Sequence, residues 1–341
     1  MNILVVGFCG SMGKRRVRCL KRLGHTNISG FDISEKSEEV AQKIGISQLK
    51  DIRNFSNGVV VLSTPPKHHV DLTKQFLSQG CHVFCEASVV PNDRHHYEEI
   101  SNLANENQSI FFPSATIRFK QSVAHIKKNM SKIGRVHSYD YRCAGNLRDW
   151  HPWQDIKDYY VSDPITGAGR EIAAFELGWL TWLFGIDAKI HGAAVMGLSE
   201  IADETGIDDL YSFLIEHSNE KGPTQGSATI DVFSHKPYRV LRIIGEEGNI
   251  EFDWVENYVR TYDENGKLVD EYVETNTEAH EGYNEFSTER MYDDELRNFF
   301  DAIQNNSEPD CNLSEDYKVL ELVEKIELIG GSHSDIHGSS N

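Results

Sequence analysis

The sequence predicts an α/β protein of two domains, in which a doubly wound parallel sheet is followed by a mostly antiparallel sheet with helices on one side. Three observations lead to this prediction. Unbroken apolar runs alternate with helical stretches as far as residue 115, which is typical of strands buried on both faces of a parallel sheet. Beyond Arg118 the strand-like segments instead alternate apolar and polar residues. A length of 341 residues allows two domains of about 100–200 residues each.

Five apolar runs make up the predicted parallel sheet, and each of the first four is followed by a helix. Parallel neighbours need such crossover segments, because a short hairpin cannot join them. The runs are 2–7, 28–32, 58–64, 82–86 and 109–115, and the helices are 13–24, 37–45, 66–80 and 92–107.

The second part of the chain begins with a helix and a strand, followed by a loop rich in aromatic residues at 145–169. The turn "DENG" at 263–266 joins two alternating runs and indicates a hairpin. The helices are 122–134, 171–185, 289–306 and 314–331, and the strands are 135–144, 188–197, 226–234, 238–254 and 257–274. We expect domains at 1–117 and 118–332, with a polar, disordered tail at 333–341.

The composition narrows the classes of function. A net charge of −19 disfavours nucleic-acid binding, which depends on basic contacts to phosphates. No apolar run reaches the ~18 residues that a membrane span needs, and the first residues lack the basic region of a signal peptide. A cytoplasmic location is therefore expected. The six cysteines are scattered and are expected to be reduced thiols, and no His or Cys spacing predicts a metal site.

A glycine-rich loop follows the first apolar run, in "VVGFCGSMGKRR". Gly7, Gly10 and Gly13 give the spacing G-x-x-G-x-x-G, with Phe8 or Cys9 in place of a displaced interior glycine. Bare backbone and a helix N-terminus together suit a diphosphate, although such a loop can also be a plain tight turn. The residues predicted to bind the cofactor here are Gly7, Phe8, Cys9, Gly10, Ser11, Met12 and Gly13.

Asp32 ends the second apolar run, where an acid can bind the ribose hydroxyls of NAD. A 2′-phosphate at ~4 Å from this carboxylate would be repelled by ~4 kcal/mol at an effective dielectric constant of ~20. Ser34 and Lys36 could soften this repulsion. We therefore expect NAD as the cofactor and NADP as the less favoured alternative.

With these segments, the chain resembles the glucose–fructose oxidoreductase and inositol dehydrogenase family, also called Gfo/Idh/MocA. The resemblance is carried by "GSMGKRR", "GFD", "STPPKHH" and "HVFCE", and it covers nearly the whole chain. It implies a Rossmann domain followed by a domain with a large open sheet, whose free face often packs against a partner subunit. A homodimer or homotetramer formed through that sheet is therefore expected. The segment "DWHPWQDIKDYY" is similar to members associated with bacterial surface sugars, including sialic-acid-like acids.

The resemblance also assigns residues that follow the third and fourth strands. Thr64, Pro65 and His69 match the family's Thr-Pro-x-x-x-His turn beside the cofactor, and Glu86 matches the acid of its Glu-Lys-Pro motif. The lysine and proline of that motif are replaced by Ala87 and Ser88. Glu86 is therefore expected to help to seat the cofactor, without the usual lysine next to it.

The family's proton-transfer helix departs from the pattern as well. Its Asp, His and second Asp correspond to Glu171, Phe175 and Gly178. Since one positioned acid or base is worth a factor of ~10²–10⁴ in rate, a replacement is needed for catalysis. We expect Glu171 to act with His151 or Tyr159 of the preceding loop. Glu171 could alternatively only complement the helix dipole.

Substrate contacts are expected from the same loop and from nearby cations. Aromatic faces bind sugar rings, and a guanidinium can hold a carboxylate or phosphate with two hydrogen bonds. The loop could instead pack on the sheet, and Arg170 could pair with a neighbouring acid. The predicted substrate residues are Arg118, Trp150, Trp153, Lys157 and Arg170.

The sequence therefore predicts an NAD(H)-dependent oxidoreductase that acts on the CH–OH group of a sugar, a sugar acid or a nucleotide sugar. Two alternatives stay open. The chain could be a catalytically silent relative that binds a dinucleotide or a sugar. It could also use tightly bound NAD for chemistry without net oxidation, such as elimination, epimerisation or hydrolysis.

Overall fold

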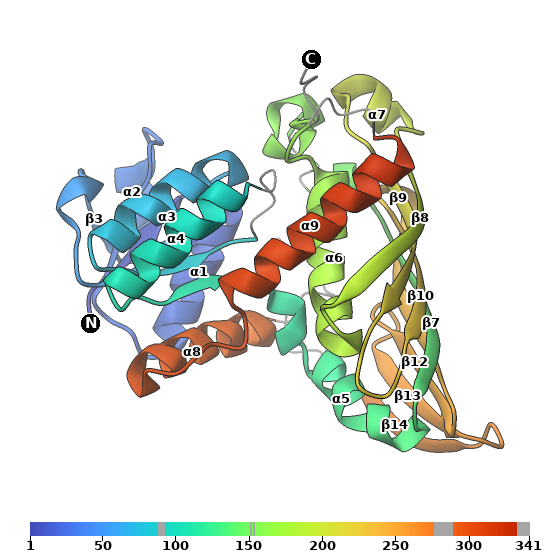
Figure 1. Cartoon of the computed structure of the whole chain (residues 1–341). Coiled ribbons are helices and arrows are strands. Elements are labelled where there is room, and N and C mark those ends of the chain that lie inside the picture. The colour runs from blue at the N-terminus through green and yellow to red at the C-terminus, as the bar shows by residue number, and fades with distance from the viewer. Residues whose placement is uncertain (88–92, 151, 153, 276–288, 333–341) are drawn as a thin grey trace. The chain divides into compact units, whose positions relative to one another are not determined.

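The computed structural model describes residues 1–87, 93–150, 152, 154–275 and 289–332 (Figure 1). These residues form two compact units. The first unit contains Met1–Thr116 and Glu289–Tyr317, and the second contains Ile117–Thr288 and Lys318–Asn341. The segment 289–317, which the sequence analysis assigned to the second domain, thus belongs to the first unit. The predicted tail 333–341 lies outside the described residues.

The first unit is built on a six-stranded sheet in the order β3-β2-β1-β4-β5-β6, in which every neighbouring pair is parallel. This confirms the predicted doubly wound sheet. The strands are β1 (Ile3–Val6), β2 (Ile28–Phe31), β3 (Ser47–Gln48), β4 (Val59–Leu62), β5 (His82–Cys85) and β6 (Phe111–Pro113). The helices are α1 (Ser11–Arg22), α2 (Ser37–Ile44), α3 (His69–Ser78), α4 (Arg94–Glu106) and α8 (Glu289–Asn305).

Central strands β1 and β4 explain why this sheet forms. All four residues of each strand are buried, as expected of apolar strands that are covered on both faces. After β1 the chain forms β2 and β3 on one side of that strand, and it then crosses over to form β4 on the other side of β1. Ligands of open α/β sheets bind beyond the carboxyl ends of the strands at such a switch point. The glycine loop after β1 and the residues after β4 therefore lie where a dinucleotide is expected.

The second unit is built on an eight-stranded sheet in the order β14-β13-β12-β11-β7-β10-β9-β8. Only the β7–β10 pair is parallel in the described ranges, so the predicted mostly antiparallel sheet is confirmed. The strands are β7 (Val136–Asn146), β8 (Ala188–Met196), β9 (Leu210–His217), β10 (Thr224–Asp231), β11 (Phe233–Gly245), β12 (Gly248–Asp253), β13 (Tyr258–Asp263) and β14 (Leu268–Val273). The helices are α5 (Gln121–Asn129), α6 (Ala168–Phe184) and α7 (Glu200–Thr205), with α9 (Leu313–Gly330) continuing from the first unit.

Helix α6 packs along one face of this sheet, over β9 and β10 (Figure 1). Strand β9 shows the resulting alternation, since Tyr211 and Phe213 are buried whereas Leu214 is 49% exposed. The opposite face carries cross-strand neighbours of alternating charge. The row runs Asp140, Arg242, Glu251, Arg260 and Glu271. Opposite charges on facing residues stabilise a sheet by ~0.2–1 kcal/mol per pair.

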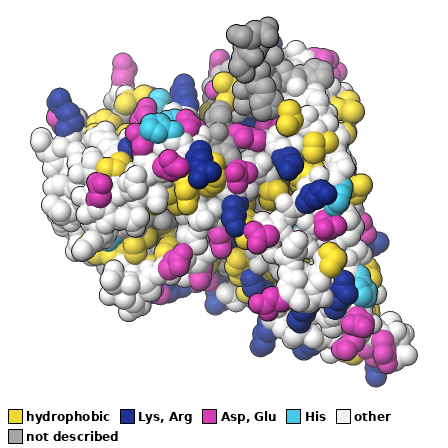
Figure 2. Space-filling view, in the orientation of Figure 1, with side chains coloured by type: hydrophobic (Ala, Val, Ile, Leu, Met, Phe, Trp, Pro, Cys, Tyr) yellow, Lys and Arg dark blue, Asp and Glu magenta, His cyan; other side chains and the backbone are white. Residues whose placement is uncertain are grey.

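The surface carries charges of both signs. Figure 2 shows acidic and basic side chains interspersed over the visible face, without one extended basic area there. Among the described residues, no helix combines the length and the apolar character that a membrane span requires.

Candidate functional site

Two glycines of the loop after β1 are fixed by close backbone contacts. Gly7 has a φ of +83°, and a Cβ there would lie 2.4 Å from the carbonyl oxygen of Ser63. A Cβ on Gly13 would lie 2.2 Å from the carbonyl oxygen of Gly7. The fold itself therefore requires both glycines, because no side chain fits at such distances.

Gly10 is different, because no atom of the described residues crowds it. It precedes α1 with an ordinary φ of −70°, and a Cβ would meet only the Gly7 carbonyl oxygen, at 3.4 Å. The Lys14 N–H donates to the Gly10 carbonyl oxygen at 3.0 Å, and the N–H groups in the first turn of an α-helix have no acceptor within the helix. Gly10 thus leaves an open cradle before a helix N-terminus, where an anion is favoured. This is the geometry that a diphosphate needs.

Phe8 and Cys9 are held in different ways within the glycine loop. The Phe8 side chain is fully buried, and a Cβ on Gly30 of β2 would lie 2.5 Å from its ring. Its side chain thus belongs to the core. Cys9 is partly exposed, and its backbone N–H donates to Asp32 Oδ2 at 2.9 Å. Burial, with a contribution from Asp32, raises the pKa of the Cys9 thiol to about 11.

Asp32 follows β2 and ties the glycine loop to the sheet edge. Its Oδ2 accepts from Cys9, and its Oδ1 accepts from the backbone N–H of Ser34 at 2.9 Å. An ionised carboxylate offers about four acceptor positions, so the partly exposed Asp32 keeps capacity for ribose hydroxyls. Ile33 beside it is 93% exposed, an apolar surface that the sequence analysis overlooked.

Polar atoms without partners mark the end of β4. The hydroxyl oxygens of Ser63 and Thr64 are buried and have no hydrogen-bond partner among the described residues. Buried polar groups normally find a partner, so such atoms suit a bound ligand. His69 is buried and pairs through Nε2 with the Thr64 carbonyl oxygen at 2.8 Å, while Pro65 is exposed. Burial lowers the pKa of His69 below its ordinary value.

Glu86, expected to seat the cofactor, is held by a buried arginine of α1. Arg16 donates through Nε to Glu86 Oε1 at 2.6 Å and through Nη2 to Oε2 at 3.1 Å. Its Nη1 lies 2.8 Å from Glu295 Oε2, on α8. Arg16 is fully buried, whereas the Glu86 side chain keeps 15% of its exposure. Glu86 therefore has a structural partner that the motif did not reveal.

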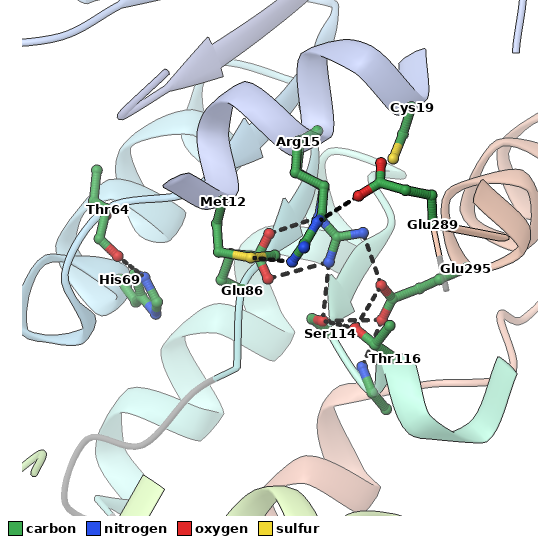
Figure 3. A network of polar contacts seen from close by, with 12 residues as sticks. Met12, Arg15, Cys19, Thr64, His69, Glu86, Ser114, Thr116, Glu289 and Glu295 are labelled. Atoms are coloured by element: carbon green, nitrogen blue, oxygen red, sulfur yellow. Dashed lines mark hydrogen bonds and ion pairs between the residues drawn. The ribbon is translucent and has the colours of Figure 1, made fainter. Parts of the chain in front are cut away.

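The second carboxylate of this network is fully satisfied. Glu295 accepts from the Ser114 hydroxyl at 2.9 Å, the Ala115 N–H at 2.7 Å and the Thr116 hydroxyl at 3.0 Å. Figure 3 shows Glu86, Ser114, Thr116 and Glu295 gathered below α1. Burial is the largest influence on the pKa of Glu295 and raises it, whereas Arg16 opposes the shift. The network joins α1, β5, β6 and α8 within the first unit.

In the second unit, glycines seat the start of α6. A Cβ on Gly169 would lie 1.9 Å from the Asp208 carbonyl oxygen, and one on Gly167 would lie 2.5 Å from that of Asp163. Glu171 falls in the first helical turn, where the helix dipole favours an acid. The Tyr160 hydroxyl donates to Glu171 Oε1 at 3.2 Å. Tyr160, the neighbour of the predicted Tyr159, is thus a tyrosine of this loop whose hydroxyl reaches Glu171.

Glu171, Phe175 and Gly178 lie along one stripe of α6, and all three are partly exposed. Arg118, expected to contact substrate, is buried and donates through Nε and Nη2 to the Gly178 carbonyl oxygen, at 3.2 and 3.0 Å. Arg170 is likewise buried, and its Nε lies 3.0 Å from Glu327 Oε1. Both arginines therefore have partners within the second unit, and Arg170 forms the ion pair that the sequence analysis kept as its alternative.

The aromatic loop divides into an exposed and a packed part. Trp150 is 38% exposed and Lys157 is exposed, whereas Tyr159 packs with Tyr160 against the apolar cluster around Val161. Burial raises the pKa of Tyr159 to about 12. The predicted residues His151 and Trp153 lie outside the described residues. Within the described ranges, no group of three or more His, Cys, Asp or Glu side chains is arranged to hold a metal ion.

The comparisons with known proteins agree with this fold. Residues 1–114 match the model of the Gfo/Idh/MocA oxidoreductase family, described as having an NAD-binding Rossmann fold. The match confirms the resemblance inferred from the sequence, and it confirms an NAD-binding Rossmann domain and NAD as the cofactor class.

Curated relatives that match part of this chain are named for an activity other than sugar oxidation. N-acetyl-gamma-glutamyl-phosphate reductase of Escherichia coli O157:H7 is 32% identical over 196 residues, which cover 51% of this chain and 58% of the relative. The chain thus spans little more than half of that protein.

Two solved structures share the fold over almost the whole chain. An oxidoreductase from Agrobacterium radiobacter in complex with NAD+, L-tartaric acid and magnesium has a TM-score of 0.80 at 13% identity, covering 97% of this chain and 96% of the other. Levoglucosan dehydrogenase in complex with NADH has a TM-score of 0.78 at 17% identity, covering 97% of both chains. Identities this low establish the fold alone.

Proposed function

We propose that the protein is an NAD(H)-dependent oxidoreductase that acts on a CH–OH group of a sugar or sugar acid. The observation that carries the proposal is the open cradle at Gly10, before the N-terminus of α1. Packing of the described residues does not require a glycine at this position. Asp32 at the end of β2 favours an unphosphorylated ribose and so NAD over NADP. The buried hydroxyls of Ser63 and Thr64 offer further partners to the cofactor.

Two structures with the same fold support the substrate class. One contains L-tartaric acid, a polyhydroxy acid, and the other is a dehydrogenase of levoglucosan, an anhydrosugar. Phe175 on α6 is partly exposed, and its aromatic ring offers an apolar face against which a sugar ring can pack. The proposed substrates are therefore small polyhydroxylated molecules, with sugar acids included.

In this proposal NAD, held by the glycine loop and Asp32, would supply the hydride acceptor for the substrate carbon, and the protein must remove the hydroxyl proton. Glu171 is the proposed base, because it is a carboxylate in the first turn of α6 with a tyrosine hydroxyl bound to one oxygen. In the reverse direction the same group would return the proton. This role requires Glu171 to be ionised at the working pH when it acts as a base.

The name of the curated relatives suggests reduction of an acyl phosphate as a second candidate. An activated cysteine thiolate could serve such acyl chemistry. All six cysteines lie in the described ranges, and only Cys9 is more than slightly exposed. Burial and the neighbouring Asp32 raise the pKa of the Cys9 thiol to about 11, which disfavours the thiolate. Alcohol oxidation therefore fits the side chains better.

The experiment measures NADH absorbance with a panel of sugars, sugar acids and one acyl phosphate, with calorimetric NAD binding in parallel. We expect NAD to bind and at least one polyhydroxylated substrate to turn over, with Glu171→Gln losing most of the rate. Turnover of the acyl phosphate alone would support the second candidate. Bound cofactor without turnover of any compound would favour the silent or redox-neutral alternatives.

A second copy of the chain is the proposed partner, docked through the outer face of the eight-stranded sheet. The alternating charges on that face could complement those of a second copy. Sedimentation at two salt concentrations tests this, since a dimer held by charged rows should weaken as salt rises.

A further inference from the structure

The contact between Tyr160 and Glu171 joins two segments that are eleven residues apart in the chain. Tyr160 begins a single 3-10 turn, Tyr160–Ser162, at the end of the aromatic loop. Glu171 lies one turn into α6. The adjacent Tyr159 packs its ring against that of Tyr160, with centroids 4.7 Å apart and an interplanar angle of 78°. The Tyr160 hydroxyl reaches the Glu171 carboxylate from this turn.

The backbone holds both partners in place. The Asp163 N–H donates to the Tyr160 carbonyl oxygen at 3.1 Å, and Val161 between them is fully buried. Gly167 lets the loop pass directly beneath the start of α6, since a Cβ there would lie 2.5 Å from the Asp163 carbonyl oxygen. The Glu171 N–H donates to the Gly167 carbonyl oxygen at 2.9 Å. The turn and the helix start thus form one connected structure.

We infer that Tyr160 is a positioning residue, whose hydroxyl orients the Glu171 carboxylate and stabilises its ionised form for proton removal. The inference rests on the proposed function, in which Glu171 is the base. A donor on a carboxylate favours the charged form, and the N-terminus of α6 adds to this effect. A base held in one orientation also needs no rearrangement when the substrate arrives.

The Tyr160 hydroxyl keeps its proton across the working range of pH. Burial raises the pKa of Tyr160 well above its ordinary value, and the charge of Glu171 and the neighbouring Tyr159 add to the shift. Burial likewise raises the pKa of Tyr159 to about 12. Both phenols therefore stay neutral below pH 9, so that Tyr160 remains a donor and Glu171 remains the acceptor.

The test compares Tyr160→Phe with a matched control, Tyr262→Phe. The control removes another tyrosine hydroxyl of the second unit that donates to a glutamate, Glu251, at 3.4 Å. Infrared difference spectra between each protein and its Glu171→Gln derivative isolate the carboxylate band, which is then titrated. We expect the Glu171 pKa to rise by about one unit in Tyr160→Phe, because a hydrogen bond to a charged group is lost. It should stay unchanged in Tyr262→Phe.

Turnover gives a second readout when a substrate has been found. The acidic limb of kcat/KM should move upward by the same amount in Tyr160→Phe, with a lower kcat and little change in KM. In protein labelled with fluorotyrosine, whose hydroxyl is the stronger donor, the Glu171 pKa should instead fall; this arm does not depend on the folding of a variant. An unchanged Glu171 pKa in both arms would overturn the inference. Since the infrared titration needs no substrate, failure of the proposed function would be seen separately, as absent turnover.

Discussion

The Gly10→Ala substitution tests whether the glycine at position 10 is needed for folding or for binding the cofactor. The new methyl group would lie 3.4 Å from the Gly7 carbonyl oxygen and clear of other described atoms, and the φ of −70° suits alanine. Replacing glycine at such a position gains ~0.4–1 kcal/mol through the unfolded state. An alanine just before a helix loses a similar amount relative to glycine. The free energy of unfolding should therefore change by less than about 1 kcal/mol.

The affinity for NAD should fall much further in Gly10→Ala. A methyl group in the cradle displaces the diphosphate, and crowding of this kind costs ~1–3 kcal/mol. Loss of one charge-assisted hydrogen bond to the helix amides costs ~1.5–3 kcal/mol more. A combined loss of about 3 kcal/mol corresponds to a roughly 150-fold weaker Kd.

The assay pairs calorimetric titration of NAD with urea unfolding of the same samples. Gly13→Ala is the contrasting variant, because its Cβ would lie 2.2 Å from backbone oxygen and should destabilise the fold itself. A Gly10→Ala protein that is stable and binds NAD as the wild type does would refute the assignment of the cradle to the diphosphate.

Three further predictions concern the charged and titratable groups. Asp32→Asn should lower the preference for NAD over NADP at least tenfold in relative Kd, because the like charge that faces a 2′-phosphate is removed. Arg16→Met should reduce the free energy of unfolding by about 3–5 kcal/mol in urea melts, since it leaves Glu295 buried without its cation, whereas Glu86→Gln should cost less because that side chain is partly solvated. Burial lowers the pKa of His217 below 6.5, so the unfolded chain binds this proton more tightly. The stability that comes from burying His217 in its neutral form is present above pH 6.5 and is lost as the pH falls through the folded-state pKa. The free energy of unfolding measured from pH 8 to 5 should depend less on pH in His217→Gln than in the wild type, by up to about 1.4 kcal/mol per pH unit.

The sheet of the first unit was predictable because its signals are local. Each apolar strand and each intervening helix can be recognised within a dozen residues, and Asp32 stands at a fixed place after β2. The two-residue strand β3 escaped prediction because Ser47 and Gln48 carry no apolar pattern. Phe8 shows the limit of motif spacing, since the loop pattern cannot tell a side chain that turns into the core from one that faces a ligand.

The site residues that were missed depend on contacts between distant segments. Glu86 pairs with Arg16 across 70 positions of the chain, and no spacing within either segment reveals that pair. Tyr159 and Tyr160 are adjacent and chemically alike, so the sequence does not reveal that the Tyr160 hydroxyl donates to Glu171. The sequence left open whether Arg170 binds substrate or forms an ion pair, because its partner Glu327 lies far along the chain in the last helix.

The entry of α8 into the first unit affects how the nucleotide-binding part can be made and studied. A fragment that stops at residue 117 would leave Arg16 without Glu295 and would expose the side of α1 that Glu289 and Asp293 cover through Arg15 and Arg22. During synthesis all six strands of this sheet leave the ribosome long before α8 is made. The nascent domain must therefore hold Arg16 with Glu86 but without its second carboxylate partner, Glu295, until the final segment emerges, so completion of this domain is tied to completion of the polypeptide.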